Sequence, residues 1–439
     1  MRAYKIRGGK PIQGEITALG AKNFVTKAMI AALLTKDKTT FTNVPAIGDT
    51  QITYDMLMGI GVGAAYDKEK GEMMIAPDSL TSSAITLPDS GANRMPILLL
   101  SALMNRFDKV SVPVLGGCKI GERKVDFHIN AIKAFGGEVI ENQFGYIASK
   151  SGRLKGTQIE LPFPSVGATE TFLYLSVLAE GTSVLKNAAV EPEIFELITM
   201  LRSMGAIIFT NVRKEFIVEG VKSLKGTNMK VLGDRIEVAS WASLACVTNG
   251  SIVVHGIRPS TLGNFLSYFR KVGGGFDLVG PESIKFYREN PLTPALIETD
   301  VYPGFSTDWQ QPFASILTQA NGVSVIHETV YERRLGYLKA LEQLGAKVQT
   351  STQCLGSAPC RFKDANHEHS AIIIGPTKLI SNNFTIQIPD LRAGLAYVIA
   401  AAAAEGTTTL TGIENIERGY GDIIPRLTKM NLDIEMTEV

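Results

Sequence analysis

The residue of this sequence best suited to proton chemistry is Cys118, which lies between an expected strand and an expected helix. Glycines precede and follow the cysteine and predict a mobile loop. Three cations crowd the thiol: Lys119, Arg123 and Lys124. Because nearby positive charge favours the thiolate, we expect a lowered pKa for Cys118, although Glu122 opposes the shift. The segment therefore predicts an acid that works near neutral pH, whereas a lone loop cysteine is ordinarily without function.

Charged or glycine residues also recur where six helices are expected to begin. These starts are Lys22, Arg94, Gly167, Asp234–Arg235, Asp308 and Asp390–Arg392. Helix N-termini offer unpaired N–H groups and a positive dipole end, and both favour phosphate binding. We expect the six starts to meet in one cleft that attracts anions. Two structural alternatives stay open: Asp308 is an ordinary N-cap, and Arg392 is the ion-pair partner of Asp390.

The elements that position these residues repeat six times along the chain. Each copy has an amphipathic helix, a turn, a short β-branched strand, and a second helix that stops at a glycine. The period is about 70 residues, and it predicts six related α/β units. The expected second-helix stops are Gly59, Gly136, Gly205, Gly273, Gly345 and, without a glycine, Met430. Between copies lie two strands separated by polar turns, which we interpret as hairpins.

The ends of the chain indicate how the six copies divide. The sixth copy ends without its hairpin, and the chain begins with an orphan one between Tyr4 and Thr17. The N-terminal strands are therefore expected to complete the C-terminal half. We predict one domain over residues 21–231 and a second formed by residues 1–20 and 232–439. The chain would cross between them near Gly20 and Gly233.

Composition excludes several classes of protein. The 439 residues carry 44 basic and 43 acidic side chains, so a formal net charge of +1 argues against nucleic-acid binding. Four cysteines are too few for a disulfide scaffold. The first residues lack the apolar core of a signal peptide, and the apolar stretch from Ala393 to Ala404 is too short to span a bilayer. We expect a cytosolic monomer with no membrane or nucleic-acid partner.

Several segments resemble one known family. The Cys118 loop resembles the lid loop of UDP-N-acetylglucosamine 1-carboxyvinyltransferases, which are enolpyruvyl transferases. Further resemblances cover nearly the whole chain. They are Gly20-Ala-Lys22-Asn23, Ser165-Val-Gly167-Ala-Thr, Ser306-Thr-Asp308, Asp390-Leu-Arg392 and Glu417-Arg418-Gly-Tyr. The resemblance implies two inside-out α/β barrel-like domains, each of three repeats, with the active site in the cleft between them.

The resemblance also implies a reaction and a role for each residue. Phosphoenolpyruvate would give its enolpyruvyl group to the 3′-hydroxyl of UDP-N-acetylglucosamine, with Cys118 as the acid and Asp308 as the base. No cofactor or metal is implied. The expected phosphoenolpyruvate ligands are Lys22, Asn23, Arg123, Arg392 and Arg418. The expected contacts of the UDP-sugar are Arg94, Arg123, Lys124, Val125, Asp126, Phe127, Ser165, Val166, Gly167, Asp308 and Val330.

The sequence departs from the family pattern at three places. Lys119 and Lys124 stand where the family usually has a small residue and a proline, and Phe163-Pro164 stands where a basic residue often reaches the diphosphate. The last departure leaves the nucleotide acceptor open. Two alternatives follow: transfer to another uridine nucleotide, or a silent paralogue that only binds a sugar nucleotide. The shikimate-pathway synthase is disfavoured, because it lacks the Gly-Gly-Cys lid.

The remaining cysteines and histidines suggest little chemistry by themselves. Cys354 and Cys360, followed by His367 and His369, resemble a zinc cluster, but their spacing matches no familiar zinc motif. We therefore expect no metal there. Cys246 lies in an apolar helix and is expected in the core. His128, near a helix start, suits a structural role as well as contact with the nucleotide.

Overall fold

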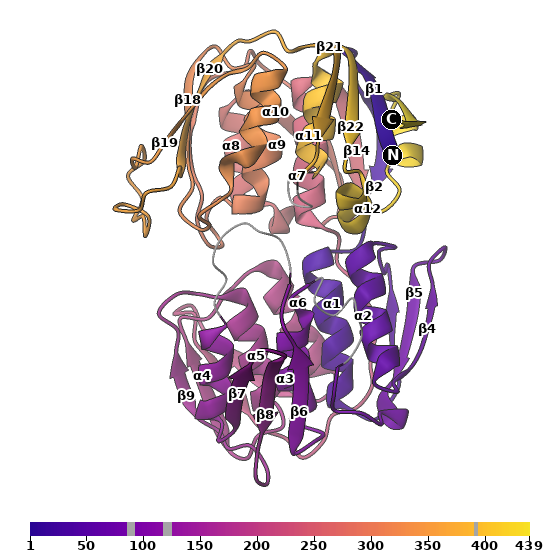
Figure 1. The fold of residues 1–439 in the computed structure, drawn as a ribbon, viewed down its shortest axis with the longest axis vertical. Helices are drawn as coiled ribbons and strands as arrows, with labels where there is room; N and C mark the ends of the chain where they lie inside the picture. The colour runs from indigo at the N-terminus through magenta and orange to yellow at the C-terminus, as the bar shows by residue number, and fades with distance from the viewer. Residues whose placement is uncertain (86–92, 117–124, 390–393) are drawn as a thin grey trace. The chain divides into compact units, whose positions relative to one another are not determined.

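The chain folds into two units, each with its own core. The computed structural model describes residues 1–85, 93–116, 125–389 and 394–439 (Figure 1). Unit 1 combines Met1–Leu19 with Gly233–Val439, and unit 2 comprises the described residues between Gly20 and Leu232. Within the described ranges, no helix is long and apolar enough to cross a membrane.

Both units are built from short strands and helices of moderate length. Unit 1 contains β1 (Arg2–Gly8), β2 (Gln13–Thr17), α7 (Arg235–Val247), β14 (Ser251–His255), α8 (Gly263–Lys271), β15 (Gly274–Gly280), β16 (Ser283–Arg288), β17 (Leu296–Glu298), the 3₁₀ helix η5 (Thr307–Trp309), α9 (Gln310–Leu317), β18 (Gly322–His327), α10 (Leu338–Gln343), β19 (Lys347–Ser351), β20 (Ser370–Gly375), β21 (Ile380–Gln387), α11 (Gly394–Ala403), β22 (Glu405–Thr411), α12 (Glu414–Tyr420), α13 (Ile424–Thr428) and β23 (Asp433–Glu438). Unit 2 contains α1 (Lys22–Ala31), β3 (Thr39–Thr42), α2 (Gly48–Gly59), β4 (Gly63–Asp67), β5 (Glu72–Ala76), α3 (Met95–Leu103), β6 (Lys109–Pro113), α4 (Asp126–Ala134), β7 (Glu138–Asn142), β8 (Gly145–Ser149), β9 (Gln158–Glu160), α5 (Val166–Ser176), β10 (Thr182–Lys186), α6 (Pro192–Ser203), β11 (Ile207–Thr210), β12 (Phe216–Glu219) and β13 (Asn228–Lys230).

Each unit has three sheets around its helices, which confirms the predicted inside-out arrangement of three repeats. The four-stranded sheets have the orders β13-β3-β5-β4, β9-β10-β12-β11, β2-β14-β16-β15, β17-β18-β20-β19 and β21-β22-β1-β23. The sheet β6-β8-β7 has three strands, and a parallel bridge between Ala84 and Ser111 lies at its fourth position. The sheets stay separate among the described residues, so they form no closed barrel.

The predicted hairpins between the copies are wrong. β8 pairs antiparallel with β6 and β7, whereas β9, the next strand along the chain, pairs in parallel with β10 of the following sheet. β12 and β13 are separated in the same way, because β13 pairs in parallel with β3. The second strand of the linker between two copies therefore forms an edge strand of the next sheet. In unit 2 the strand that follows the third repeat, β13, joins the sheet of the first repeat.

The N-terminal strands complete the sheets of unit 1. β1 lies between β22 and β23 and is antiparallel to both, with Tyr4 opposite Leu410 and Met436 (Figure 1). β2 is also no hairpin partner of β1, because it pairs in parallel with β14 in the sheet of the fourth repeat. The third strand in the sheet of the sixth repeat is thus β1, from the N-terminal end of the chain.

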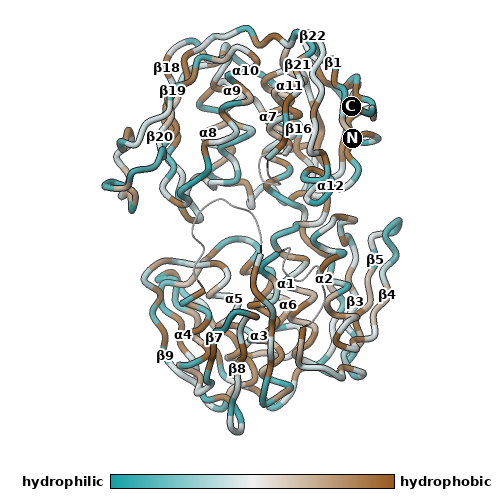
Figure 2. Tube along the Cα trace, viewed as in Figure 1, coloured by the Kyte–Doolittle hydropathy of each residue, from teal (hydrophilic) through white to brown (hydrophobic). Residues whose placement is uncertain are grey.

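The first helix of every repeat lies in the centre of its unit. All residues of α7 are buried, and so are all residues of α9, which identifies helices surrounded by protein rather than surface helices. The alanine-rich stretch forms α11, which is buried from Gly394 to Ala402 and confirms the expected buried helix. Figure 2 shows apolar residues along these helices and hydrophilic ones at the tips of the outer turns.

The helix boundaries follow the repeat pattern. α1 begins at Lys22, Arg94 is the N-cap residue of α3, and Asp234 is that of α7. After the second helices the backbone turns left-handed, with positive φ at the expected Gly136, Gly205, Gly273 and Gly345 and at Asn431. In the first copy this residue is Gly61 rather than the expected Gly59, which is still the last residue of α2. In the sixth copy asparagine replaces glycine, because its side chain also tolerates this conformation.

Candidate active site

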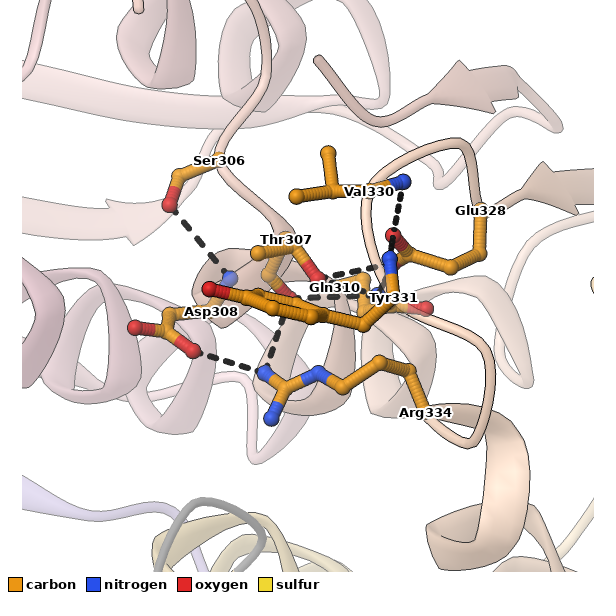
Figure 3. A network of polar contacts seen from close by, with 8 residues as sticks. All are labelled: Ser306, Thr307, Asp308, Gln310, Glu328, Val330, Tyr331 and Arg334. Atoms are coloured by element: carbon orange, nitrogen blue, oxygen red, sulfur yellow. Dashed lines mark hydrogen bonds and ion pairs between the residues drawn. The ribbon is translucent and has the colours of Figure 1, made fainter. Parts of the chain in front are cut away.

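Asp308 lies in the 3₁₀ turn that precedes α9. The residue that caps this turn is Ser306, whose Oγ accepts a hydrogen bond from the Asp308 backbone N–H at 3.3 Å (Figure 3). The structural alternative that Asp308 is an ordinary N-cap is therefore wrong, since Ser306 fills that position. The Asp308 carboxylate instead reaches a partner from another part of the chain.

That partner is Arg334, in the loop that follows β18. Its guanidinium donates to Asp308 Oδ1 at 2.7 Å and to the Thr307 carbonyl at 3.3 Å (Figure 3). The Arg334 side chain is 1% exposed and that of Asp308 is 14% exposed. Because the guanidinium is rigid and buried, it fixes both the turn and the direction of the carboxylate.

A second carboxylate, Glu328, anchors the loop on the other side of the turn. It is fully buried and accepts hydrogen bonds from Thr307 Oγ1 at 2.7 Å and from the Gln310 side-chain amide. The N–H groups of Val330 and Tyr331 donate to its other oxygen at 2.6 and 2.8 Å (Figure 3). Four donors explain how a buried carboxylate is tolerated here, and they join the loop to the start of α9.

Val330, expected to meet the sugar, is held by its backbone. Its N–H is bound by Glu328, and its carbonyl accepts a hydrogen bond from Arg361. A carbonyl oxygen has two lone pairs, so this contact still leaves acceptor capacity for a ligand.

Arg235 and its neighbour support the same region of unit 1. Asp234 caps α7 by accepting from the N–H groups of Ile236 at 2.8 Å and Glu237 at 3.3 Å. The Arg235 guanidinium lies over the ring of Trp309, 5.2 Å from its centroid, and is 5% exposed. This arrangement is a cation–π contact that packs one helix start against another.

In unit 2, Lys22 and Asn23 are the first two residues of α1. Lys22 Nζ forms an ion pair with Asp49 Oδ2 at 3.0 Å, and both side chains are 13% exposed. Asp49 lies in the first turn of α2, and no side chain of Ala21 caps α1. Lys22 is thus a half-buried cation held at a helix start, where an anion is favoured.

The two segments expected to contact the nucleotide lie against each other. Ser165 caps α5 by accepting from the Ala168 N–H at 3.3 Å. Gly167 faces the ring of His128, because a Cβ at this position would lie 3.0 Å from His128 Cε1. His128 Nδ1 is also 2.7 Å from Thr171 Oγ1. His128 therefore packs the starts of α4 and α5 together, which is a structural role.

Other predicted residues occupy helix starts or helices of their own unit. Val125 precedes α4, and Asp126 and Phe127 begin it, with Asp126 exposed. Arg94 is half-buried before α3, and Arg418 is half-buried within α12. Residues outside the described ranges are Cys118, Lys119, Arg123, Lys124, Asp390 and Arg392.

Sequence reasoning missed three residues that organise these positions. They are Arg334, Glu328 and Asp49, and none stands in a motif with characteristic spacing. Of the three, only Glu328 stands out in the sequence, because it is an acidic residue directly after the buried end of a strand. Such a residue must be satisfied by partners from elsewhere in the fold.

Comparisons with known proteins place the chain in a family. Residues 6–427 match the model of EPSP synthase (3-phosphoshikimate 1-carboxyvinyltransferase). The UDP-N-acetylglucosamine 1-carboxyvinyltransferase of Protochlamydia amoebophila (strain UWE25) is 44% identical over 100% of this chain and 95% of that protein. The UDP-N-acetylglucosamine 1-carboxyvinyltransferase 1 of Clostridium acetobutylicum is 33% identical over the full length of both.

Solved structures with lower identity share the fold. The enolpyruvyl transferase NikO from Streptomyces tendae has a TM-score of 0.88 at 21% identity, covering 100% of this chain and 99% of that one. An EPSP synthase from Acinetobacter baumannii has a TM-score of 0.71 at 17% identity and covers both chains fully. On the full-length sequence matches, this chain belongs to the enolpyruvyl (carboxyvinyl) transferase family.

Proposed function

We propose that the protein transfers the enolpyruvyl group of phosphoenolpyruvate to the 3′-hydroxyl of UDP-N-acetylglucosamine and releases phosphate. The observation that carries the proposal is the Asp308 carboxylate, held at a helix start by the buried Arg334. An alcohol needs such an oriented base before it can attack carbon. The full-length relatives that bear the name of this activity support the same reaction.

The reaction needs three proton transfers: from the sugar hydroxyl, to C3 and from C3. Asp308 orients or deprotonates the sugar hydroxyl, whose oxygen forms a bond to C2 of phosphoenolpyruvate while Cys118 delivers a proton to C3. The resulting tetrahedral intermediate returns a proton from C3 to the Cys118 thiolate as the C2–O bond to phosphate breaks, and the departing phosphate takes up the proton released by the sugar hydroxyl. The products are the enolpyruvyl ether and inorganic phosphate, so atoms and charges balance.

Cations and helix starts would hold the anionic groups of the substrates. Lys22 already has a carboxylate partner in Asp49, so phosphoenolpyruvate would share or replace that partner. The other residues assigned to phosphoenolpyruvate are Asn23, Arg123, Arg392 and Arg418. The residues assigned to the UDP-sugar are Arg94, Arg123, Lys124, Val125, Asp126, Phe127, Ser165, Val166, Gly167 and Val330.

A second acceptor is favoured by one feature of the sequence. Phe163 and Pro164 precede the helix start at Ser165, where a basic residue would strengthen the hold on a diphosphate. A different uridine nucleotide therefore stays a candidate acceptor. The alternative of a silent paralogue is disfavoured by the ordered Asp308–Arg334 pair, since a binding protein has no need of an oriented base.

The acceptor can be identified by measuring phosphate release with several compounds. The panel is UDP-N-acetylglucosamine, its C4 epimer, UDP-glucose and shikimate 3-phosphate, each with phosphoenolpyruvate. We expect release with the first compound and at least about 10²-fold less with UDP-glucose and shikimate 3-phosphate, and Asp308→Ala serves as the inactive control. Faster release with another acceptor would overturn the assignment, and no release with any would favour a silent protein.

The proposal places the protein in the committed step of peptidoglycan synthesis, and hence in cell-wall formation. We expect it to act in the cytosol as a monomer and to be inhibited by fosfomycin. Size-exclusion chromatography with light scattering tests the oligomeric state, and the adduct experiment described below tests the inhibitor.

A further inference from the structure

Four side chains at the end of β18 come together in unit 1. His327 is the last residue of β18, and Cys354 and Cys360 lie on the loop between β19 and β20. His369 directly precedes β20. One nitrogen or sulfur atom from each residue lies within 4.8 Å of the corresponding atoms of the other three. We propose that these residues bind one Zn²⁺ in a tetrahedral Cys₂His₂ site.

The spacing of the ligand atoms suits zinc. Bonds of about 2.3 Å to sulfur and about 2.0–2.1 Å to nitrogen place the atoms of a tetrahedron about 3.3–3.8 Å apart. Cys354 Sγ and His369 Nε2 are 3.4 Å apart. The remaining atoms need only small movements to reach a common centre. Two thiolates with two imidazoles are a typical ligand set for this metal.

Both histidines of the cluster are buried, and one of them, His327, has no hydrogen-bond partner among the described residues. His327 and His369 have no exposed surface. Neither ring nitrogen of His327 makes a hydrogen bond to any described residue. A buried polar group of this kind calls for an explanation, and a metal ion supplies one. Cys354 and Cys360 are not joined by a disulfide, so both sulfurs are available as ligands.

Neighbouring groups orient both imidazoles toward the cluster. His369 Nδ1 lies 3.0 Å from the His367 carbonyl, which accepts a hydrogen bond from the Nδ1–H and leaves Nε2 for the metal. His327 Nδ1 lies 3.5 Å from Glu298 Oε1, so we assign Nε2 of this ring to the metal as well. Carbonyl or carboxylate partners behind a histidine are common at zinc sites.

The loop that carries Cys354 and Cys360 (the cysteine loop) approaches His327 closely. A Cβ at Gly356 would lie 2.4 Å from His327 Nδ1 and 2.1 Å from Glu298 Oε1, so only glycine fits there. Glu298 also accepts from the Ala358 N–H at 2.6 Å. In addition, the Phe362 N–H donates to Cys360 Sγ at 3.4 Å, as backbone amides do to metal-bound thiolates. These contacts hold the loop in place for binding.

Sequence spacing concealed the site for a physical reason. The fourth ligand, His327, comes from a strand that is separated from the cysteine loop by α10 and β19. His367, which stands near the cysteines in sequence, contributes a backbone carbonyl rather than a ligand nitrogen. With four protein ligands the site has no open position for substrate, which indicates a structural role rather than a catalytic one.

The metal would connect the cysteine loop to the candidate active site. Arg361, in the same loop, donates to the Val330 carbonyl and lies 3.7 Å from a carboxylate oxygen of Glu332. Binding of zinc is therefore expected to fix Arg361 and, through it, the loop that carries Val330. This consequence rests on the proposed function, whereas the metal site itself does not.

Metal content tests the site directly. The full-length chain, reduced and without an affinity tag, is incubated with Zn²⁺, dialysed, and analysed by elemental mass spectrometry. We expect about one zinc per chain. Cys354→Ser and His369→Gln should lose most of it. Cys246→Ala, which changes a buried cysteine outside the cluster, and His367→Gln, which keeps the backbone carbonyl, should retain it.

Cobalt binding to the wild-type protein guards against variants that fail to fold. Chelator-treated protein titrated with Co²⁺ should develop thiolate charge-transfer bands and the visible bands of tetrahedral cobalt, saturating near one equivalent. Re-adding Zn²⁺ should raise the Tm of the wild type and leave that of folded Cys354→Ser unchanged.

Two results would overturn the metal site. One is reduced wild-type protein that binds neither metal, and the other is a Cys354–Cys360 disulfide found by peptide mapping of metal-free protein as isolated. Both readouts are independent of turnover. A protein that releases phosphate with no acceptor can still bind one zinc, and a protein that binds no metal can still release phosphate, so the two proposals fail separately.

Discussion

Replacing Arg334 with methionine should lower turnover through Asp308 alone. Arg334 is 1% exposed and donates to Asp308 at 2.7 Å and to the Thr307 carbonyl at 3.3 Å. Methionine fills similar volume but makes neither hydrogen bond. Because misplacement of a reacting group by about 1 Å can cost up to about 10²-fold, we expect kcat to fall by about 10–100-fold. The KM values should change by less than about 3-fold.

The same variant should also be less stable. Breaking a buried ion pair by removing one partner costs about 3–5 kcal/mol, because the other charge stays buried. Asp308 is 14% exposed, so the lower end of this range applies. Arg333→Met is the matched control, since Arg333 is the exposed neighbour of Arg334. It should leave both the Tm and kcat unchanged.

A double-mutant cycle separates positioning from direct participation. Asp308→Asn alone should lower kcat by about 10²-fold or more, the usual scale for loss of a general base. If Arg334 acts only by holding Asp308, adding Arg334→Met to Asp308→Asn should lower kcat by less than about 3-fold further. Steady-state phosphate release measures all four proteins. Multiplication of the two single effects would refute this reasoning and show that Arg334 contacts the reacting groups itself.

Three further predictions concern other residues. Fosfomycin should form one covalent adduct on Cys118, seen by peptide mass spectrometry, and Cys118→Asp should block it while keeping turnover; labelling of another cysteine contradicts the assignment. Lys22→Met should raise the KM for phosphoenolpyruvate by about 10-fold or more, because a charge-assisted contact is lost, with the KM for the UDP-sugar within about 3-fold. Burial raises the pKa of Glu170 from 4.5 to about 7, so the folded protein favours the protonated carboxyl. The contribution of this group to the free energy of unfolding is therefore complete below about pH 4.5 and is lost as the pH rises through 7. Glu170→Gln should therefore raise the Tm at pH 8 but not at pH 4.5, unlike the exposed-site control Glu219→Gln, and an equal shift at both pH values argues against the raised pKa.

The helices of this fold were predictable because their signals are local. Repeated apolar stretches, a charged or glycine residue near the start of each first helix, and a glycine or asparagine after the second helix mark their ends. Asp234, for example, caps α7 with two hydrogen bonds, as its position before an apolar run suggested. Burial of α11 followed from its composition, since a helix of alanine and other apolar residues has no polar face to turn to water.

Strand pairing was not predictable in the same way. β8 and β9 have the alternation and the polar turn of a hairpin, yet β9 pairs with β10, which lies beyond α5. The sequence between two strands indicates that the chain turns, but the partner is chosen by which sheet edge the following helix brings close. The pairing of β1 with β22 could be inferred only from the missing strand of the sixth repeat.

For the candidate site, motifs found single residues but not their partners. Asp308 was recognised from a short motif, whereas Arg334 comes from a loop whose position depends on β18. For the same reason, nothing in the sequence indicated that His327 lies beside Cys354 and Cys360. A side chain brought in from a distant strand leaves no spacing pattern, so a tertiary contact of this kind needs the structure.

The end of β18 links the two clusters described for unit 1. His327 belongs to the proposed metal site, and the next residue, Glu328, binds Thr307 and the N–H of Val330. Successive side chains of an extended segment point to opposite sides, so one short stretch of backbone serves both. The Glu328 N–H also donates to the carbonyl of His369 at 2.7 Å, which joins this stretch to the last metal ligand. Any change that moves His327 or His369 should therefore displace Glu328 and, through its hydrogen bonds, the turn that carries Asp308.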